Sequence, residues 1–181
     1  RNVYNRTGLF SKLDEARDSS AIWISAPPGS GKTTLISSYL HEKSCAYIWY
    51  HVDENDLDVA TFFWYMRLAA RELKPSEYQQ LPAYTSAYQG GLGAFALRYF
   101  EKRYAMLPPD FVIFIDDVHL AEDNDSLNVT LMQAITTLPT YGSMVIMSRN
   151  PLPAELCRLR VNESLQVLDW VDLQLTQEEM R

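Results

Sequence analysis

The sequence has 181 residues, 47% of them hydrophobic and 12% aromatic, so it is long and apolar enough to bury the core of one globular domain. Its formal net charge of −7 disfavours a surface for DNA or RNA, because such binding depends on lysines and arginines that neutralise phosphates. The two cysteines, Cys45 and Cys157, lack the spacing of a zinc site or of a disulfide-rich secreted scaffold, which favours a reduced, cytoplasmic setting. No apolar run approaches the ~20 residues that cross a bilayer, so we expect a soluble protein.

The N-terminal part of the chain is expected to form a helix, a strand, a glycine-rich turn and a second helix. Apolar residues at helical spacing predict a short helix over residues 7–17. A short apolar run over 21–26 predicts a strand, and the turn at 27–31 leads into a predicted helix over 32–43. Four side chains of this second helix are expected to face inward: Leu35, Ile36, Tyr39 and Leu40.

The next part of the chain continues this alternation. A strand is predicted over residues 46–52 and an aromatic-rich helix over 59–73, as expected where helices connect parallel strands. The stretch 74–93 is polar and rich in turn residues, so we predict that it is the most mobile segment. A further helix is expected over 94–107.

The C-terminal half repeats the pattern. Residues 111–115 form a continuous apolar run, which is typical of a central strand buried on both faces. A helix is predicted over 127–138, a fourth strand over 143–148 and a fifth over 165–168. This regular alternation predicts an α/β fold built on a parallel sheet.

The segment from Ala26 to Thr34 carries the most specific motif. It matches the phosphate-binding loop G-x-x-x-x-G-K-[ST], except that alanine replaces the first glycine. Two glycines allow successive backbone N–H groups to point into one concavity, the following helix N-terminus adds positive charge, and Lys32 supplies a cation for the β and γ phosphates. Thr33 offers its hydroxyl to Mg²⁺. The candidate phosphate-binding residues are Pro28, Gly29, Ser30, Gly31, Lys32, Thr33 and Thr34.

Charged residues at two strand ends complete the candidate site. Asp116, after the apolar run, is the candidate that orients Mg²⁺, and Asp117 could position an attacking water. Arg149 closes the fourth strand, where an arginine can sense a γ-phosphate and stabilise charge in the transition state. The alternatives are solvated carboxylates and an ordinary surface arginine. We take Asp117, Asp116 and Arg149 as candidate catalytic residues. His119 has no metal-ligand spacing and is interpreted as structural or as a support for a neighbouring site residue.

Six aromatic residues gather on the second predicted strand and the helix after it. Aromatic side chains dominate protein cores, and only a minority lie on binding surfaces. We therefore predict that this group is packed in the core rather than forming a surface for bases or partners. Its members are Trp49, Tyr50, Phe62, Phe63, Trp64 and Tyr65.

These stretches together resemble the nucleotide-binding core of the STAND class of signal-transduction ATPases, in particular the bacterial maltose-activator-like and large LuxR-type regulators. The resemblance covers nearly the whole chain. It rests on Arg6, Leu9 and Leu13, on A-P-P-G-S-G-K-T-T-L at 26–35, I-W-Y-H-V-D-E-N-D at 48–56, F-I-D-D-V-H at 114–119, S-R-N-P-L-P at 148–153 and L-D-W-V-D-L-Q-L-T-Q-E-E at 168–179.

The resemblance implies a P-loop NTPase of the ASCE type, a three-layer α/β sandwich around a five-stranded parallel sheet of order 5-1-4-3-2. It makes Arg149 the γ-phosphate sensor and places Arg6 near the nucleotide base or a hinge. It also implies a nucleotide-binding domain over residues 1–175. Residues 176–181 would begin a truncated helical lid domain, and T-Q-E-E at their start fits a capping box.

The same resemblance implies a regulatory switch that is bound to ADP at rest and to ATP when active, and that slow ATP hydrolysis resets. An inducer or partner protein would act through other domains of a longer parent, and ATP would favour homo-oligomers. Transcription regulation would be the output. Neither a membrane nor direct nucleic-acid contact is expected for this part.

Other interpretations stay open. A working ATPase of the AAA+ type would need an arginine from a neighbouring subunit and a lid to close its site. A catalytically silent scaffold would keep the fold alone, although the intact Lys32, Thr33 and Asp116 count against it. A small-molecule kinase ranks last, since no acceptor-site motif lies between the second and third strands. The sequence has no guanine-specifying N-K-x-D stretch, which favours adenine.

Overall fold

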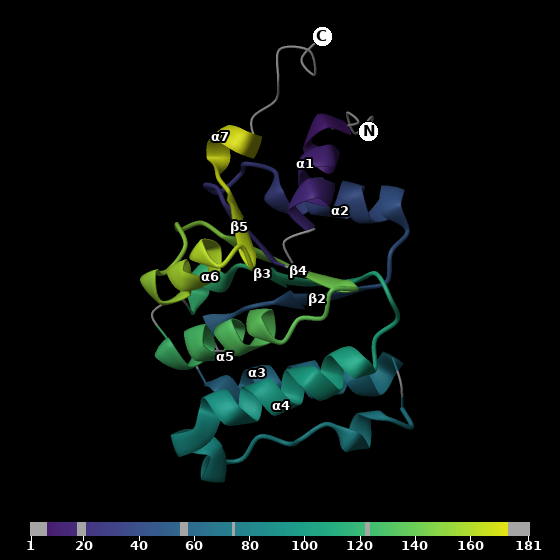
Figure 1. Cartoon of the computed structure of the whole chain (residues 1–181), viewed down its shortest axis with the longest axis vertical. Coiled ribbons are helices and arrows are strands. Elements are labelled where there is room, and N and C mark those ends of the chain that lie inside the picture. The colour runs from purple at the N-terminus through teal and green to yellow at the C-terminus, as the bar shows by residue number, and fades with distance from the viewer. Residues whose placement is uncertain (1–6, 18–20, 55–57, 74, 122–123, 174–181) are drawn as a thin grey trace.

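The computed structural model describes residues 7–17, 21–54, 58–73, 75–121 and 124–173. Over these ranges a parallel sheet is flanked by helices on both faces (Figure 1). The strands are β1 (Ala21–Ser25), β2 (Tyr47–His51), β3 (Phe111–Asp116), β4 (Gly142–Ser148) and β5 (Leu165–Leu168). The α-helices are α1 (Thr7–Arg17), α2 (Lys32–Lys43), α3 (Val59–Leu73), α4 (Leu92–Ala105), α5 (Asp125–Thr136), α6 (Cys157–Val161) and α7 (Trp170–Leu173).

The five strands pair in the order β2-β3-β4-β1-β5, and every pairing is parallel. This is the predicted order 5-1-4-3-2 read from the opposite edge, so the expected P-loop NTPase fold is confirmed. β4 lies between β1 and β3, as the resemblance implied. Because all the strands run the same way, the residues after β1, β2, β3 and β4 meet at one edge of the sheet.

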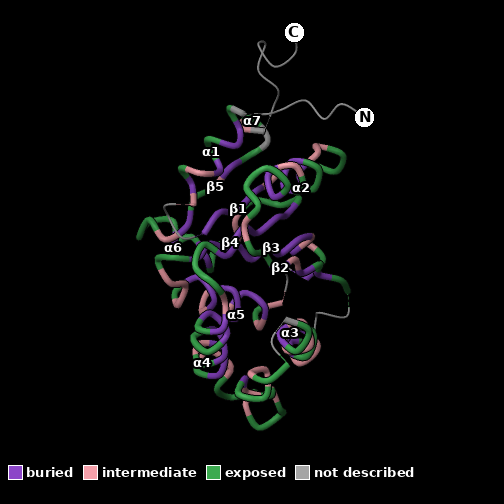
Figure 2. Tube along the Cα trace, turned by 90° about the vertical axis from the view of Figure 1, so that its right-hand side faces the viewer, coloured by how far each residue is buried: buried purple, intermediate pink, exposed green. Residues whose placement is uncertain are grey.

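Buried hydrophobic side chains form one cluster on each face of the sheet. Ile22 and Ile24 of β1 join the cluster under α1 and α2, whereas Trp23 points to the opposite face, where α3, α4 and α5 pack. β3 and β4 are buried along their whole length, which agrees with the apolar runs of the sequence (Figure 2). The molecule is therefore the predicted three-layer sandwich.

The predicted elements agree with the structure except at several boundaries. α2, α3 and β5 have the predicted bounds, and the four predicted inward residues of α2 are all buried. α4 and α5 each begin two residues earlier than predicted, at Leu92 and Asp125. Asn124 explains the start of α5, because its side chain accepts a hydrogen bond from the Ser126 N–H and caps the helix.

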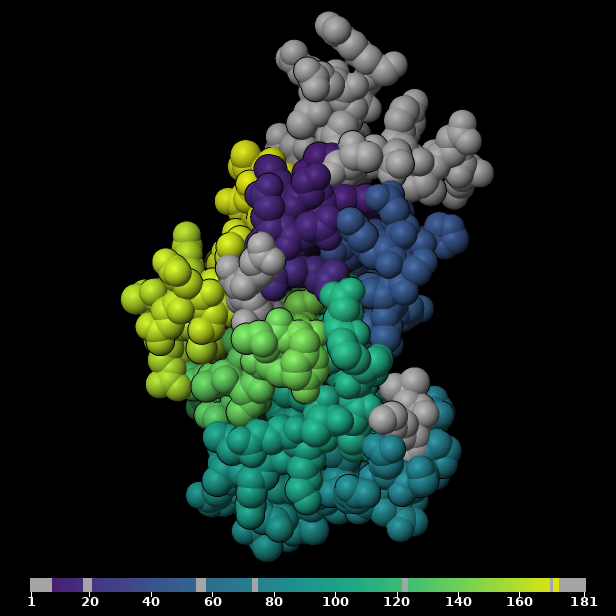
Figure 3. Space-filling view, turned by 45° about the vertical axis from the view of Figure 1, so that its right-hand side comes forward, coloured from purple at the N-terminus to yellow at the C-terminus, as the bar shows by residue number. Residues whose placement is uncertain are grey.

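The stretch predicted to be mobile carries local structure that the sequence analysis did not predict, and its mobility stays a prediction. It contains two 3-10 helices, Tyr78–Gln80 and Ser86–Gly91. Leu81 between them is buried, and the Tyr84 ring stacks on Phe63 of α3 at 5.5 Å between centroids. Figures 1 and 3 show this segment lying along α3 and α4 at the end of the molecule remote from α1. Its turn-rich composition predicts a loop and does not indicate that Leu81 and Tyr84 pack on the core.

The aromatic group is only partly packed, which corrects the prediction. Phe62 and Phe63 are buried in the core, and Tyr50 is buried beside them. Trp64 and Tyr65, however, are 59% and 46% exposed, because the outer face of α3 is not covered. A run of four aromatics on one helix cannot face one side only, since successive residues are turned by about 100°.

Arg6 and the capping box from Thr176 to Glu179 lie outside the described residues, so their predicted roles stay predictions. Within the described ranges, each helix is too short or too polar to span a bilayer.

Candidate nucleotide-binding site

The loop between β1 and α2 has the backbone shape that its glycines allow. Gly29 and Gly31 have φ angles of 73° and 84°, in the left-handed region that favours glycine. The Ser30 N–H donates to the Pro27 carbonyl at 3.3 Å, which closes a turn, and α2 begins directly after Gly31. Pro28, Gly29 and Thr34 are exposed. The loop therefore presents itself to solvent at the positive end of α2.

Lys32, the first residue of α2, is folded back against this loop and is only 8% exposed. Its ammonium donates to the Ala26 carbonyl, to the Pro27 carbonyl at 3.2 Å and to the Ser30 hydroxyl at 3.4 Å. Burial lowers the pKa of Lys32 and Arg149 lowers it too, whereas the carboxylates of Asp116 and Asp117 raise it. The cation therefore lies within electrostatic range of all three predicted charged residues.

Thr33 and Asp116 meet across the sheet edge. The Thr33 hydroxyl donates to the Asp116 carboxylate at 3.4 Å, although 83 residues separate them. Asp116 is 4% exposed, and burial raises its pKa, as does the charge of Asp117; the Asp117 N–H and the Thr33 hydroxyl act in the opposite direction. The Thr33 hydroxyl oxygen and the Asp116 carboxylate are thus held close together by α2 and β3.

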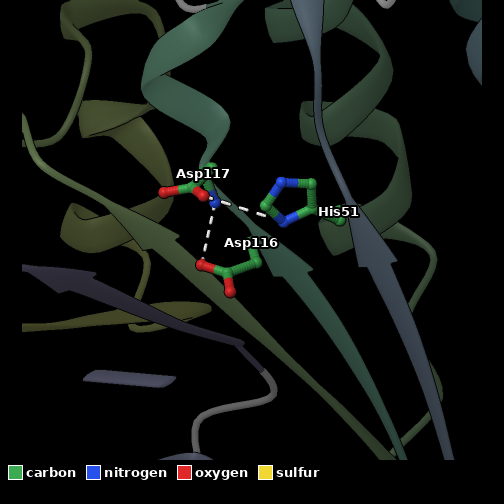
Figure 4. Close-up of side chains that lie close together, drawn as sticks. All are labelled: His51, Asp116 and Asp117. Carbon is green, nitrogen blue, oxygen red and sulfur yellow. Dashed lines mark hydrogen bonds and ion pairs between the residues drawn. The ribbon is translucent and has the colours of Figure 1, made fainter. Parts of the chain in front are cut away.

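Asp117 adopts a left-handed conformation with φ of 55°, which among residues other than glycine is most often seen for asparagine and aspartate. Its N–H donates to the Asp116 carboxylate at 2.9 Å, and its own carboxylate lies 3.7 Å from an imidazole nitrogen of His51 (Figure 4). An imidazole nitrogen of His119 also lies 3.7 Å from this carboxylate. The side chain of His119 is 10% exposed and that of His51 is 60% exposed. Asp117 therefore lies between two histidines at the sheet edge.

His51 is the residue that the sequence analysis missed. It ends β2 and pairs in register with Asp116 of β3, and possible ligand atoms of His51, Asp116 and Asp117 lie within 4.8 Å of one another. The predicted strand at 46–52 could have indicated His51, because the residue at the end of a strand parallel to and beside β3 lies next to Asp116.

Arg149 follows β4 directly and is exposed. The residue before it, Ser148, holds the loop in place, because its carbonyl accepts from the Ala26 N–H at 3.2 Å. The Asn150 N–H donates to the Ser148 hydroxyl at 2.9 Å, which turns the chain at the strand end. Arg149 is thus carried on a turn tied to the start of the glycine-rich loop.

Comparison with known proteins shows sequence similarity to transcriptional regulators. The chain is 29% identical over 178 residues to the HTH-type transcriptional regulator MalT of Cronobacter sakazakii, and 26% identical over 180 residues to MalT of Yersinia enterocolitica. The matches cover 97% and 99% of the chain. The chain is similar in sequence to MalT-type transcriptional regulators. This agrees with the predicted resemblance, and the chain spans 19% and 20% of the two MalT sequences. No protein-family model matches it.

Solved structures share the fold at lower sequence identity. A structure of Drosophila ORC bound to DNA matches with a TM-score of 0.56 and 18% identity over 91% of this chain and 42% of that one. A second, of Drosophila ORC bound to AT-rich DNA and Cdc6, matches with a TM-score of 0.58 and 10% identity over 96% of this chain and 57% of that one. At these identities the solved structures support the P-loop fold alone.

Proposed function

We propose that this chain is the nucleotide-binding regulatory domain of a MalT-type transcription regulator, and that it switches between an ADP-bound resting form and an ATP-bound active form. The observation that carries the proposal is the meeting of Thr33 and Asp116 beside Lys32, at the start of a helix whose preceding loop has two left-handed glycines. Slow ATP hydrolysis would return the switch to its resting form.

The loop would bind the phosphates. Backbone N–H groups of residues 29–34 lie at or before the N-terminus of α2, where the helix dipole favours negative charge. The ammonium of Lys32 would exchange its present carbonyl partners for phosphate oxygens, a stronger acceptor because it is charged. The loop is therefore preorganised for a diphosphate or triphosphate.

The donor atoms at the strand end suit magnesium. Mg²⁺ prefers oxygen ligands, and the Thr33 hydroxyl and the buried Asp116 carboxylate are both oxygens held within hydrogen-bond distance. A bound Mg²⁺ would neutralise charge on the phosphates. Thr33 and Asp116 would hold it. Burial raises the pKa of Asp116 because it disfavours the ionised carboxylate, and a bound cation would favour that ionised form.

Two further residues would act on the terminal phosphate. Asp117 carries its carboxylate at the sheet edge, 3.7 Å from a ring nitrogen of His51 and 3.7 Å from one of His119, where it would orient an attacking water. Arg149, tied to the loop through Ser148, would contact the γ-phosphate. Only ATP presents that group, so Arg149 would distinguish the two nucleotides.

The setting of the domain is also proposed. MalT is named as an HTH-type regulator, so a parent of this chain would act in the cytoplasm and contact DNA through another domain. The net charge of −7 disfavours direct nucleic-acid contact by this chain. An inducer or partner protein would act through other domains and favour ATP-dependent homo-oligomers. Residues 1–175 would form the nucleotide domain, and 176–181 would begin its lid.

The test is a titration of the protein with a fluorescent ADP analogue in magnesium buffer, with unlabelled ATP, ADP and GTP as competitors. We expect ATP and ADP to displace the analogue, GTP to compete more weakly, and chelation of magnesium to lower the affinity. No binding in magnesium buffer would contradict the proposal and leave a silent scaffold. Phosphate release faster than nucleotide exchange would favour a working ATPase over a switch.

Arg149→Ala is expected to weaken ATP binding about five-fold and to leave ADP binding within two-fold of the parent protein. The reason is that an exposed arginine contributes about 1 kcal/mol through a charged contact, and only ATP carries the γ-phosphate. Competition titrations with ATP and ADP measure how much each affinity falls in the variant. Arg160→Ala, which removes an exposed arginine of α6, is the matched control. Equal losses for ATP and ADP would rule out the sensor role.

A further inference from the structure

A buried arginine in α4 has no anionic partner among the described residues. Arg103 is 1% exposed and ranks among the largest fully buried side chains. Its Nε and Nη2 atoms are buried and donate to no acceptor, and the ion pairs of the described ranges do not include it. Burial lowers the pKa of Arg103. A guanidinium stays charged in proteins, so an unpaired one in the interior is strongly unfavourable.

The neighbouring polar groups do not compensate this charge. Tyr99 lies one helical turn earlier, and its buried hydroxyl likewise has no hydrogen bond to any residue that the structure describes. Burial holds the pKa of Tyr99 well above its ordinary value, so the phenol stays neutral. Arg67 of α3, which also acts on Tyr99, adds a second positive charge. Among the described residues no hydrogen bond or ion pair therefore satisfies the Arg103 guanidinium nitrogens Nε and Nη2.

Arg103 lines a pocket that is otherwise mostly apolar. The pocket has a volume of about 190 Å³ and lies between the C-terminal end of α4, the start of β2 and the start of β3. Its apolar wall includes Ile48, Met106, Leu107 and Phe111. In Figure 1 the chain leaving α4 rises towards β3 beside the chain that enters β2. A cavity of about 150 Å³ is enough to hold benzene, so this pocket fits a ligand slightly larger than that ring.

We propose that this pocket binds a small organic carboxylate, whose charged end pairs with Arg103 and whose ring or short aliphatic chain packs on the apolar wall. A guanidinium presents two parallel N–H donors that match the two oxygens of a carboxylate. The apolar wall and the small volume disfavour a phosphate, which needs donors on several sides. Nε and Nη2 expose almost no surface, so the carboxylate would pair with them after a small shift of the Arg103 side chain towards the pocket.

The pocket is independent of the proposed nucleotide site. Tyr47, Ile48 and Phe111 lie at the amino ends of their strands, whereas His51 and Asp116 lie at the carboxyl ends. Ligand binding at Arg103 can therefore be measured without nucleotide, and its failure would leave the nucleotide proposal untouched.

The test measures thermal unfolding of the protein with benzoate or hexanoate, and with benzyl alcohol or hexanol as uncharged analogues. We expect the two carboxylates to raise the melting temperature in a concentration-dependent manner, because a ligand that binds only the folded state stabilises it. The alcohols should raise it much less. No rise with either carboxylate up to millimolar concentrations, or an equal rise with the alcohols, would overturn the proposal.

Arg103→Met separates a binding role from a packing role. This variant should weaken carboxylate binding about ten- to a hundred-fold, the value of a charge-assisted contact. Without ligand it should melt at or above the temperature of the parent protein, because methionine removes an unpaired buried charge at similar volume. Arg98→Met, at an exposed position of the same helix, should keep the carboxylate response. A carboxylate response that survives in Arg103→Met, or a large loss of stability without ligand, would refute the assignment.

Discussion

Lys32→Ala is expected to weaken binding of ADP and ATP by about ten- to a hundred-fold. The ammonium lies against the loop carbonyls at a site that is only 8% exposed, so its contact with a phosphate would be poorly screened by water. Such a charge-assisted contact contributes about 1.5 to 3 kcal/mol. Titration of both proteins with a fluorescent ADP analogue measures the difference.

The fold of the variant must be checked separately, because Lys32 also donates to the carbonyls of Ala26 and Pro27. Thermal unfolding without nucleotide gives this control. Lys102→Ala removes an exposed lysine of α4 and should bind ADP as the parent protein does. If Lys32→Ala folds and binds ADP with unchanged affinity, the loop is not a phosphate site.

Gly142→Ala is expected to destabilise the fold by about 1 to 3 kcal/mol, the cost of overpacking a well-packed core. A Cβ atom at Gly142 would lie 2.2 Å, 2.4 Å and 2.8 Å from three carbons of the Phe111 ring, which is too close for any real contact. The ring has little room to move, because it is 1% exposed and stacks on Tyr104 at 5.6 Å between centroids. Chemical denaturation measures the change in the free energy of unfolding.

Two further variants show whether the ring causes the loss. Phe111→Leu removes the ring, so the double variant Gly142→Ala with Phe111→Leu should lose less stability than the sum of the single changes. Gly93→Ala is the control, since the nearest side-chain atom to its new Cβ lies at 3.7 Å, an ordinary contact. A Gly142→Ala protein as stable as its parent would mean that β3 and β4 pack differently.

The local pattern of the sequence was enough to predict most of the fold. Ile36 and Tyr39 sit at helical spacing after a glycine turn, and both are buried in α2 as predicted. The apolar run from Phe111 to Ile115 is typical of a buried central strand, and all of its residues are buried as predicted. The order of the strands came from the resemblance to a known family, because no local pattern states which strands pair.

The features that were missed depend on tertiary contacts. Leu81 and Tyr84 lie in a turn-rich stretch whose order comes from packing on Phe63, a residue far from them in the sequence. Trp64 is exposed because no element covers that side of α3, a fact that composition cannot reveal. His51 belongs to the candidate site only through the register of β2 on β3. The unpaired charge of Arg103 likewise appears only once α4 is packed.

The unequal size of the two hydrophobic clusters bears on how the protein opens. Among the described residues the cluster under α1 and α2 contains 16 buried hydrophobic residues, and the cluster on the opposite face contains 31. A layer that buries less apolar surface separates from the sheet at a lower free energy. Amide hydrogens of α2 would therefore exchange with solvent sooner than those of α4 and α5. A nucleotide bound to the loop before α2 would stabilise the layer of α1 and α2, which opens first. Release of the nucleotide would therefore lower the free energy of opening of that layer more than that of the rest of the fold.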